Sequence, residues 1–136
     1  MHTTNYQDTF IEVAEDCPVT TAEIPVAKNG KPTIASMQYD IISKHPYKYT
    51  SDDVVFNAFA QKNELTKAEM PAEKEKFFSK GQPCLRASPL TKRYGWGVHS
   101  DAKGRVAIYG LESKEYEKMS KDKELMHLKG MRSKKA

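Results

Sequence analysis

The chain lacks several features by which protein classes are recognised. Its 136 residues contain two cysteines, Cys17 and Cys84, which are too few for a disulfide framework. No apolar run approaches the roughly 20 residues that span a bilayer. The first residues lack the basic and apolar regions of a secretion signal. We therefore expect a soluble, cytoplasmic protein with two free thiols and no membrane contact.

Familiar ligand motifs are also missing from the sequence. It contains no Walker loop, no dinucleotide fingerprint and no Gly-x-Ser-x-Gly nucleophile elbow. No pair of residues has the local Cys-x-x-Cys or His-x-x-x-His spacing of a metal site. A metal would need Cys17, Cys84, His99 and a carboxylate to be brought together by the fold. We therefore expect no metal and no cofactor.

Net positive charge is confined to the C-terminal segment. The net charge is +4, and residues 121–136 hold six basic and two acidic residues, so residues 1–120 are balanced. We predict one globular domain over 1–120 and a basic tail over 121–136 that is flexible, or helical through Leu125, Met126 and Leu128. Alternatively, this tail is an electrostatic arm for nucleic acid or acidic partners.

Apolar residues at helical spacing, together with capping signals, predict four helices, over 33–44, 50–62, 71–80 and 113–119. Pro46 ends the first, because the residue before a proline avoids helical geometry. Thr50 and Asp53 match a capping box at the start of the second helix. Gly81 is expected to close the third.

One strand is predicted near the N-terminus, over 9–14. Three more are predicted after the third helix, over the short segment 82–87 and over 94–99 and 105–110. The last two form a hairpin, and we expect the first strand to join it. Helices grouped between strands favour an α+β fold. The expected architecture is a small antiparallel sheet, the N-terminal strand plus the C-terminal hairpin, packed against three to four helices.

The hairpin has two chemically different faces. Alternation places Tyr94, Trp96 and Val98 on a face that we expect to be core. A buried Trp96 needs an acceptor for its indole N–H. Gly95 and Gly97 leave bare backbone on the opposite face, which is covered by Tyr109 or a helix, or is open to a ligand.

If the glycine face is open, it forms a shallow groove for an anionic or planar ligand, because guanidinium groups grip phosphate and carboxylate. The nearby segment Lys92–Trp96 also has the chemistry of a nucleic-acid surface, with cations for phosphates and aromatic rings for stacking, although its spacing is unspecific. The candidate binding residues are Arg86, Lys92, Arg93, Tyr94, Trp96, His99, Arg105 and Tyr109.

Catalysis is the alternative to binding, and the residues leave open whether the chain is an enzyme. The catalytic candidates are Cys17, Cys84 and His99, since a histidine can activate a thiol when a carboxylate such as Asp16 orients its ring. The leading hypothesis is a binding module for an anionic small molecule or partner, with nucleic acid as a second kind of partner. The rival is a thiol-dependent enzyme or redox protein.

Four segments resemble a family of small, uncharacterised bacterial proteins: Asn5–Tyr6, Thr9–Pro18, Pro46–Val54 and Cys84–His99. The most specific is Ser-Pro-Leu-Thr-Lys-Arg-Tyr-Gly-Trp-Gly-Val-His over residues 88–99. The resemblance covers most of residues 3–119 and leaves out the tail from Lys121. It implies a single cytoplasmic domain without an assigned activity, and it transfers no catalytic residue.

Overall fold

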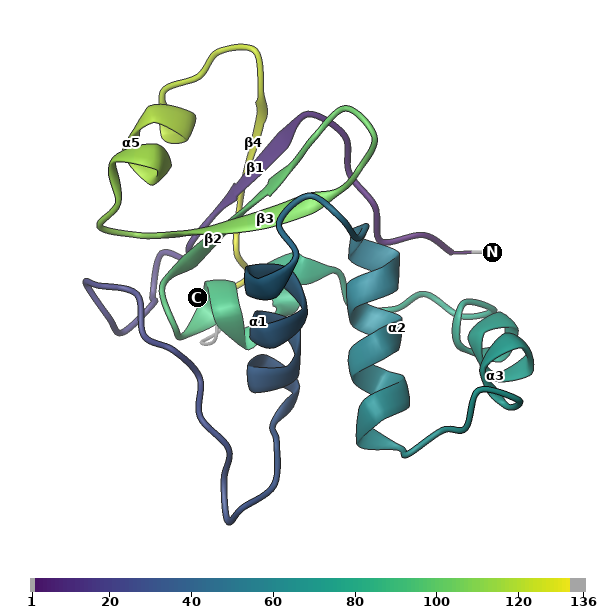
Figure 1. Cartoon of the computed structure of the whole chain (residues 1–136). Helices are drawn as coiled ribbons and strands as arrows, with labels where there is room; N and C mark the ends of the chain where they lie inside the picture. The colour runs from purple at the N-terminus through teal and green to yellow at the C-terminus, as the bar shows by residue number, and fades with distance from the viewer. Residues whose placement is uncertain (1, 133–136) are drawn as a thin grey trace.

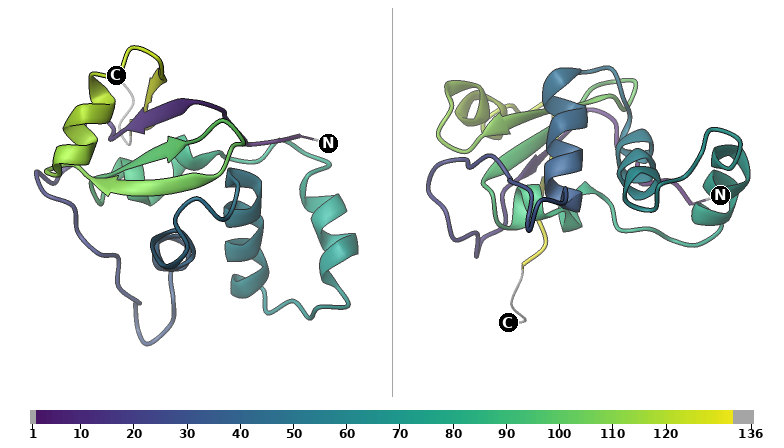
Figure 2. Two further views of the ribbon diagram at one scale, coloured as in Figure 1. Left: turned by 45° about the horizontal axis from the view of Figure 1, so that its top comes forward. Right: turned by 60° about the horizontal axis from the view of Figure 1, so that its bottom comes forward.

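The computed structural model describes residues 2–132 as a four-stranded sheet with helices on both faces (Figures 1 and 2). The strand order is β3-β2-β1-β4. The elements are β1 (Thr9–Glu12), α1 (Ile34–Lys44), α2 (Ser51–Lys62), α3 (Met70–Phe77), the 3₁₀ turn η1 (Leu85–Ala87), α4 (Pro89–Lys92), β2 (Trp96–Ser100), β3 (Val106–Gly110), α5 (Lys114–Ser120) and β4 (Met126–Lys129). The α+β class is confirmed, as is the packing of the first strand and the hairpin against helices.

The register of the sheet sorts its side chains onto two faces. Strands β2 and β3 pair antiparallel with Val98 opposite Ile108, and β1 pairs antiparallel with β2 with Ile11 opposite Val98. Ile11, Val98 and Val106 are almost fully buried in one cluster with apolar residues of α1, α2 and α4. The helix pair α1 and α2 therefore covers this face, while α5 lies on the other (Figure 2).

Helix starts follow local capping chemistry. The Asp53 N–H donates to Thr50 Oγ1 (3.2 Å) and the Thr50 N–H donates to Asp53 Oδ2 (3.1 Å), which confirms the capping box of α2. Thr33 caps α1 in the same way with Ser36 as its partner. The last helix begins after Ser113, as expected.

Several element boundaries differ from the predictions, among them the start of the hairpin, where β2 begins at Trp96 rather than at Tyr94. Residues 82–87 form no strand, because Ser88 caps a short helix that begins at Pro89, and η1 precedes it. The third helix ends at Phe77 rather than Lys80, and the Gln82 side-chain amide donates to the Phe77 carbonyl (2.6 Å), so no glycine cap at Gly81 is needed. Strand β1 ends at Glu12, because the Val13 N–H donates to the Tyr116 hydroxyl (2.9 Å) instead of a strand.

The prediction of a helical tail through Leu125, Met126 and Leu128 is wrong. These residues lead into and form β4, which pairs parallel with β1 and places Leu128 beside Ile11. The edge of β1 would otherwise expose unpaired backbone groups. The pairing satisfies them, with the Gly130 N–H donating to the Glu12 carbonyl (2.7 Å). The end of the predicted tail, residues 133–136, lies outside the described residues.

Within residues 2–132, no helix has both the length and the apolar character needed to cross a bilayer.

Candidate functional site

The glycine face of the hairpin is covered rather than open. A Cβ placed on Gly97 would lie 2.7 Å from ring atoms of both Phe10 and Tyr116. These two rings meet edge to face with their centroids 5.0 Å apart. Tyr116 belongs to α5, so this helix fills the strip of bare backbone. One of the two expected arrangements, cover by a helix, is therefore found.

His99 belongs to a hydrogen-bonded cluster with Tyr47 and Tyr109. The Tyr47 hydroxyl lies 2.8 Å from His99 Nδ1 and 2.7 Å from the Tyr109 hydroxyl. Burial lowers the pKa of His99 below its ordinary value, against the opposing effect of nearby carboxylates, chiefly Asp101. Burial and the hydrogen bond with Tyr109 raise the pKa of Tyr47 far above its usual range. Burial therefore favours the uncharged forms of His99 and Tyr47.

Arg86 and Arg105, two of the candidate binding residues, each have a partner within the protein. Arg105 Nε lies 3.5 Å from Asp101 Oδ2, within the turn that joins β2 to β3. Arg86 Nε donates to the Lys129 carbonyl (2.7 Å) and so holds the end of β4. Among residues 2–132, Arg86 makes no hydrogen bond to Tyr47, His99 or Tyr109. Arg86 therefore holds backbone, whereas Arg105 pairs with a neighbouring side chain.

Trp96 packs at the edge of the core. Its indole N–H donates to the Glu23 carbonyl (2.8 Å), which is the acceptor that a buried tryptophan requires. Its ring lies 5.3 Å from that of Tyr39 on α1. Trp96 is half-buried and packs against the central apolar cluster.

The thiol candidates are not assembled into a catalytic arrangement in the described part of the chain. Cys84 Sγ lies 3.5 Å from the Tyr6 hydroxyl, whereas the side-chain partner of His99 is Tyr47. Cys17 and Cys84 both have free thiols. Among residues 2–132, no three His, Cys, Asp or Glu side chains are grouped to hold a metal ion.

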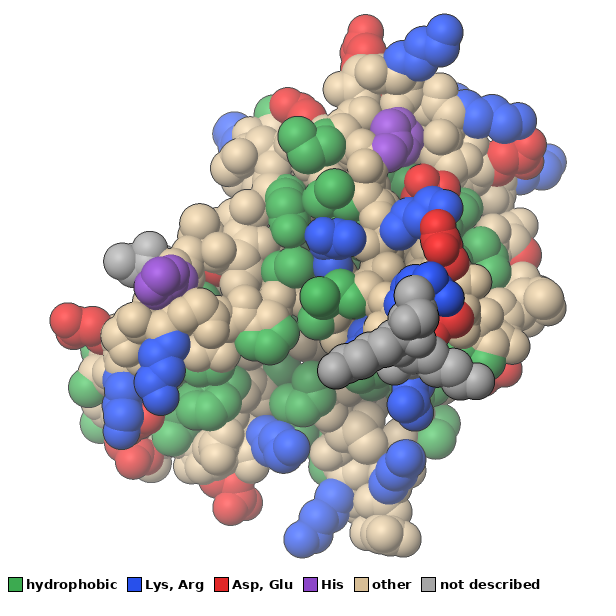
Figure 3. Space-filling view, turned by 180° about the vertical axis from the view of Figure 1, so that it is seen from behind, with side chains coloured by type: hydrophobic (Ala, Val, Ile, Leu, Met, Phe, Trp, Pro, Cys, Tyr) green, Lys and Arg blue, Asp and Glu red, His purple; other side chains and the backbone are tan. Residues whose placement is uncertain are grey.

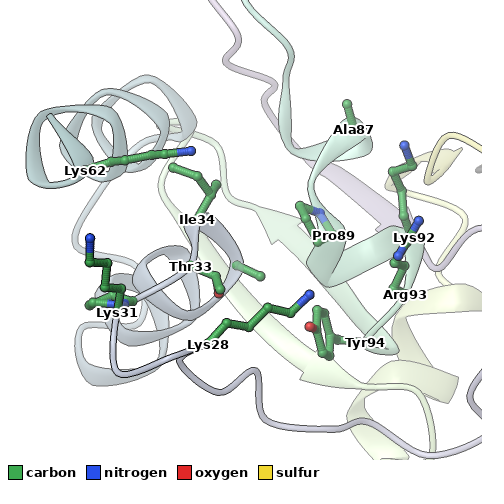
Figure 4. A pocket seen from close by; sticks show the side chains of 12 residues that line it. Lys28, Lys31, Thr33, Ile34, Lys62, Ala87, Pro89, Lys92, Arg93 and Tyr94 are labelled. Carbon is green, nitrogen blue, oxygen red and sulfur yellow. The ribbon is translucent and has the colours of Figure 1, made fainter.

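Three of the predicted binding residues do lie together, on one wall of a cleft at the start of α1. Lys92, Arg93 and Tyr94 line a cavity of about 570 Å³. The facing wall comes from the loop before α1 and from the C-terminal end of α2 (Figure 4). The side chain of Lys28 extends toward Tyr94, and Lys62 extends from α2 toward Ile34 (Figure 4).

The loop before α1 owes its shape to a tight turn. Asn29 and Gly30 have φ of 52° and 75°, which suit these residue types, and Lys28 and Lys31 exchange two backbone hydrogen bonds of 2.9 Å. The turn places both lysines on the rim of the cleft. The capping box at Thr33 then starts the helix directly below them.

The cleft is strongly positive. Its charged lining residues are Lys28, Lys31, Lys62, Lys92 and Arg93, and no carboxylate lines it. Within residues 2–132, none of these five cations pairs with a carboxylate within 4.0 Å. Seen from behind, Lys and Arg side chains lie around hydrophobic side chains on the lower part of the surface (Figure 3).

Backbone N–H groups add to the positive potential of the cleft. Ile34 and Ala35 are the first two residues of α1 and line the cleft. Their N–H groups donate to no acceptor among residues 2–132. Such amides at a helix start, with the positive end of the helix dipole, favour an anion.

Sequence reasoning missed Lys28, Lys31 and Lys62 because they lie far from the hairpin along the chain. The Asn29-Gly30 pair was the available signal for Lys28 and Lys31, since it predicted a chain turn next to the start of a helix. Nothing local marked Lys62, whose place depends on how α2 packs against α1.

Comparison with known proteins identifies one matching family. A family model described as "Family of unknown function (DUF6157)" matches residues 1–136. No curated protein and no solved structure matches the chain.

Proposed function

We propose that this chain, which belongs to the DUF6157 family of unknown function, is a binding module for a small phosphate-bearing ligand. The ligand occupies the cationic cleft at the start of α1. The observation that carries the proposal is the gathering of five cations, without ion-pair partners among residues 2–132, in a cavity without a carboxylate. Like charges that line one cavity repel one another, and an anion between them lowers that cost.

The dimensions and donors of the cleft favour a small molecule with several negative charges. A volume of about 570 Å³ falls within the range of small-molecule pockets. The cations stand on two facing walls, so a ligand with more than one anionic group can bind both at once. Ammonium and guanidinium groups form charge-assisted hydrogen bonds to phosphate oxygens, and the Ile34 and Ala35 amides supply further donors.

This proposal keeps the anionic ligand expected from the sequence but moves its site. Lys92, Arg93 and Tyr94 remain as binding residues, on the wall formed by α4 and the residues after it. Tyr116 fills the space at Gly97, Arg86 binds the Lys129 carbonyl and Arg105 pairs with Asp101.

Isothermal titration with inorganic triphosphate at low ionic strength tests the proposal. We expect saturable binding that weakens as salt is added, because salt screens exposed charges. The double substitution Lys92→Ala/Arg93→Ala should weaken binding at least about tenfold, since it removes two charge-assisted contacts.

The matched control is Lys114→Ala/Lys118→Ala on α5, which removes two charges on the other side of the sheet. It should leave the affinity nearly unchanged. Equal losses of triphosphate affinity in both double variants would show that binding depends on overall charge, and would contradict the proposed site. Absence of triphosphate binding by the unaltered protein at low salt would contradict the function.

A further inference from the structure

The cationic cleft continues into a second cavity with a different lining. This cavity has a volume of about 510 Å³ and shares four lining residues with the cationic cleft: Ile34, Lys62, Ala87 and Pro89. The two cavities therefore adjoin one another, and we refer to them as the two halves of one cleft. The first half carries the charge, and we refer to the second as the apolar half.

Two phenylalanine rings dominate the apolar half. Phe59 of α2 and Phe77 of α3 both line it, with ring centroids 4.7 Å apart and planes tilted by 40°. Both rings are half-buried, so each keeps surface that a ligand can cover. Val55 adds an aliphatic wall. A flat apolar group gains contact area from such a surface.

Polar groups beside these rings restrict what can bind there. The Gln38 side chain is 6% exposed, and its Oε1 accepts from Ser88 Oγ at 2.5 Å. Its Nε2 donates to no acceptor among residues 2–132. Asn63 donates through Nδ2 to the Phe59 carbonyl, which leaves its Oδ1 as an acceptor at the same cavity.

An alkyl chain in this space would cover both amides without matching them, at the cost of unpaired polar groups. A nucleobase is flat, can lie against an aromatic ring, and has donors and acceptors along its edge. Its phosphates would extend toward the cationic half, past the shared residue Lys62.

We propose that the ligand is a nucleotide, with its base in the apolar half against Phe59 and Phe77 and its phosphates in the cationic half. The Gln38 amide donates to the edge of the base. This inference rests on the proposed function, because it assumes that the cationic half holds phosphate.

Titration of ATP and of inorganic triphosphate into the same protein, without divalent cations, separates the two halves. A stacked base contributes enough for ATP to bind about tenfold more tightly than triphosphate. Phe59→Leu should remove most of this advantage while leaving triphosphate affinity unchanged. Gln38→Glu keeps the acceptor for Ser88 and deletes the free N–H donors, so it should also reduce the ratio of the two affinities.

The matched control is Tyr49→Leu, an aromatic residue just before α2 that lines neither half. It should keep the full advantage of ATP over triphosphate. Equal affinity for ATP and triphosphate would overturn the nucleotide inference and leave the proposed function standing. Tighter binding of octyl phosphate than of ATP would also overturn it, in favour of an alkyl ligand. If the unaltered protein bound neither ATP nor inorganic triphosphate, both proposals would be overturned.

Discussion

Gly97 shows how one residue decides which face of the hairpin can bind. The rings of Phe10 and Tyr116 occupy the space that any side chain at this position would need. The sequence indicated that something approaches Gly97 closely, since a glycine within a strand marks such an approach. Whether this was a ligand or the protein itself depended on Tyr116, 19 positions further along the chain.

Gly97→Ala should destabilise the fold, because its Cβ would lie 2.7 Å from two ring atoms in a packed interface. Overpacking of this kind costs about 1–3 kcal/mol in the free energy of unfolding. Urea denaturation followed by circular dichroism measures it. Gly81→Ala is the control, because no heavy atom lies within 4 Å of a Cβ there. Equal stability of Gly97→Ala and the unaltered protein would contradict the cover by α5.

His99 makes the stability of the protein depend on pH. Burial lowers its pKa in the folded state below the ordinary value of 6.5, so the unfolded chain takes up the proton first as pH falls. The stabilising contribution is present above pH 6.5 and is lost as the pH falls through the folded-state pKa.

The free energy of unfolding should therefore drop more between about pH 7.5 and about pH 5.5 in the unaltered protein than in His99→Gln, which has no imidazole to titrate. Urea titrations at both pH values provide the comparison. The same drop in the two proteins would show that His99 makes no net contribution to this pH dependence.

At the scale of elements, β4 explains why the last part of the chain does not behave as its composition suggests. Its basic residues predicted a solvated tail, yet the backbone pairs with β1 and the Lys129 carbonyl accepts from Arg86. Composition reports how side chains interact with water, whereas strand pairing depends on backbone groups more than 100 residues away. The parallel pairing of β4 with β1 therefore could not be predicted from the local sequence.

Leu128→Ala should lower the free energy of unfolding by about 1–2 kcal/mol, less than a fully buried leucine would cost, because the side chain is half-buried against the core. Met126→Ala tests the same strand at a side chain that is 59% exposed, and it should change stability little. Chemical denaturation compares them. Equal effects of the two substitutions would contradict the packing of β4 on the core.

Helices and the hairpin were predictable because their signals are local. The capping pair Thr50–Asp53 and the serine at 113 act over three or four residues, so they mark α2 and α5 whatever the rest of the fold does. The end of α3 was not predictable in this way. Its last carbonyl is satisfied by the Gln82 side chain, a contact that no helix-stop pattern contains.

At the scale of the whole molecule, the proposed site belongs to no single element. Its cations come from the loop before α1, from α2, and from α4 with the residue after it. The segment Lys92–Tyr94 was identified from the sequence because its residues are neighbours along the chain. The opposite wall exists only once α1 and α2 pack together against the sheet. Sequence reasoning therefore found part of the site and could not find its shape.

The central claim is that an anion binds at the start of α1, and amide chemical shifts test it most directly. ¹H–¹⁵N spectra would be recorded during titration of the unaltered protein with inorganic triphosphate. The account predicts large, saturable shifts of the Ile34 and Ala35 amides, with those of α5 nearly unchanged. Shifts centred on His99 and Arg105 would place the anion on the hairpin instead and would contradict the account.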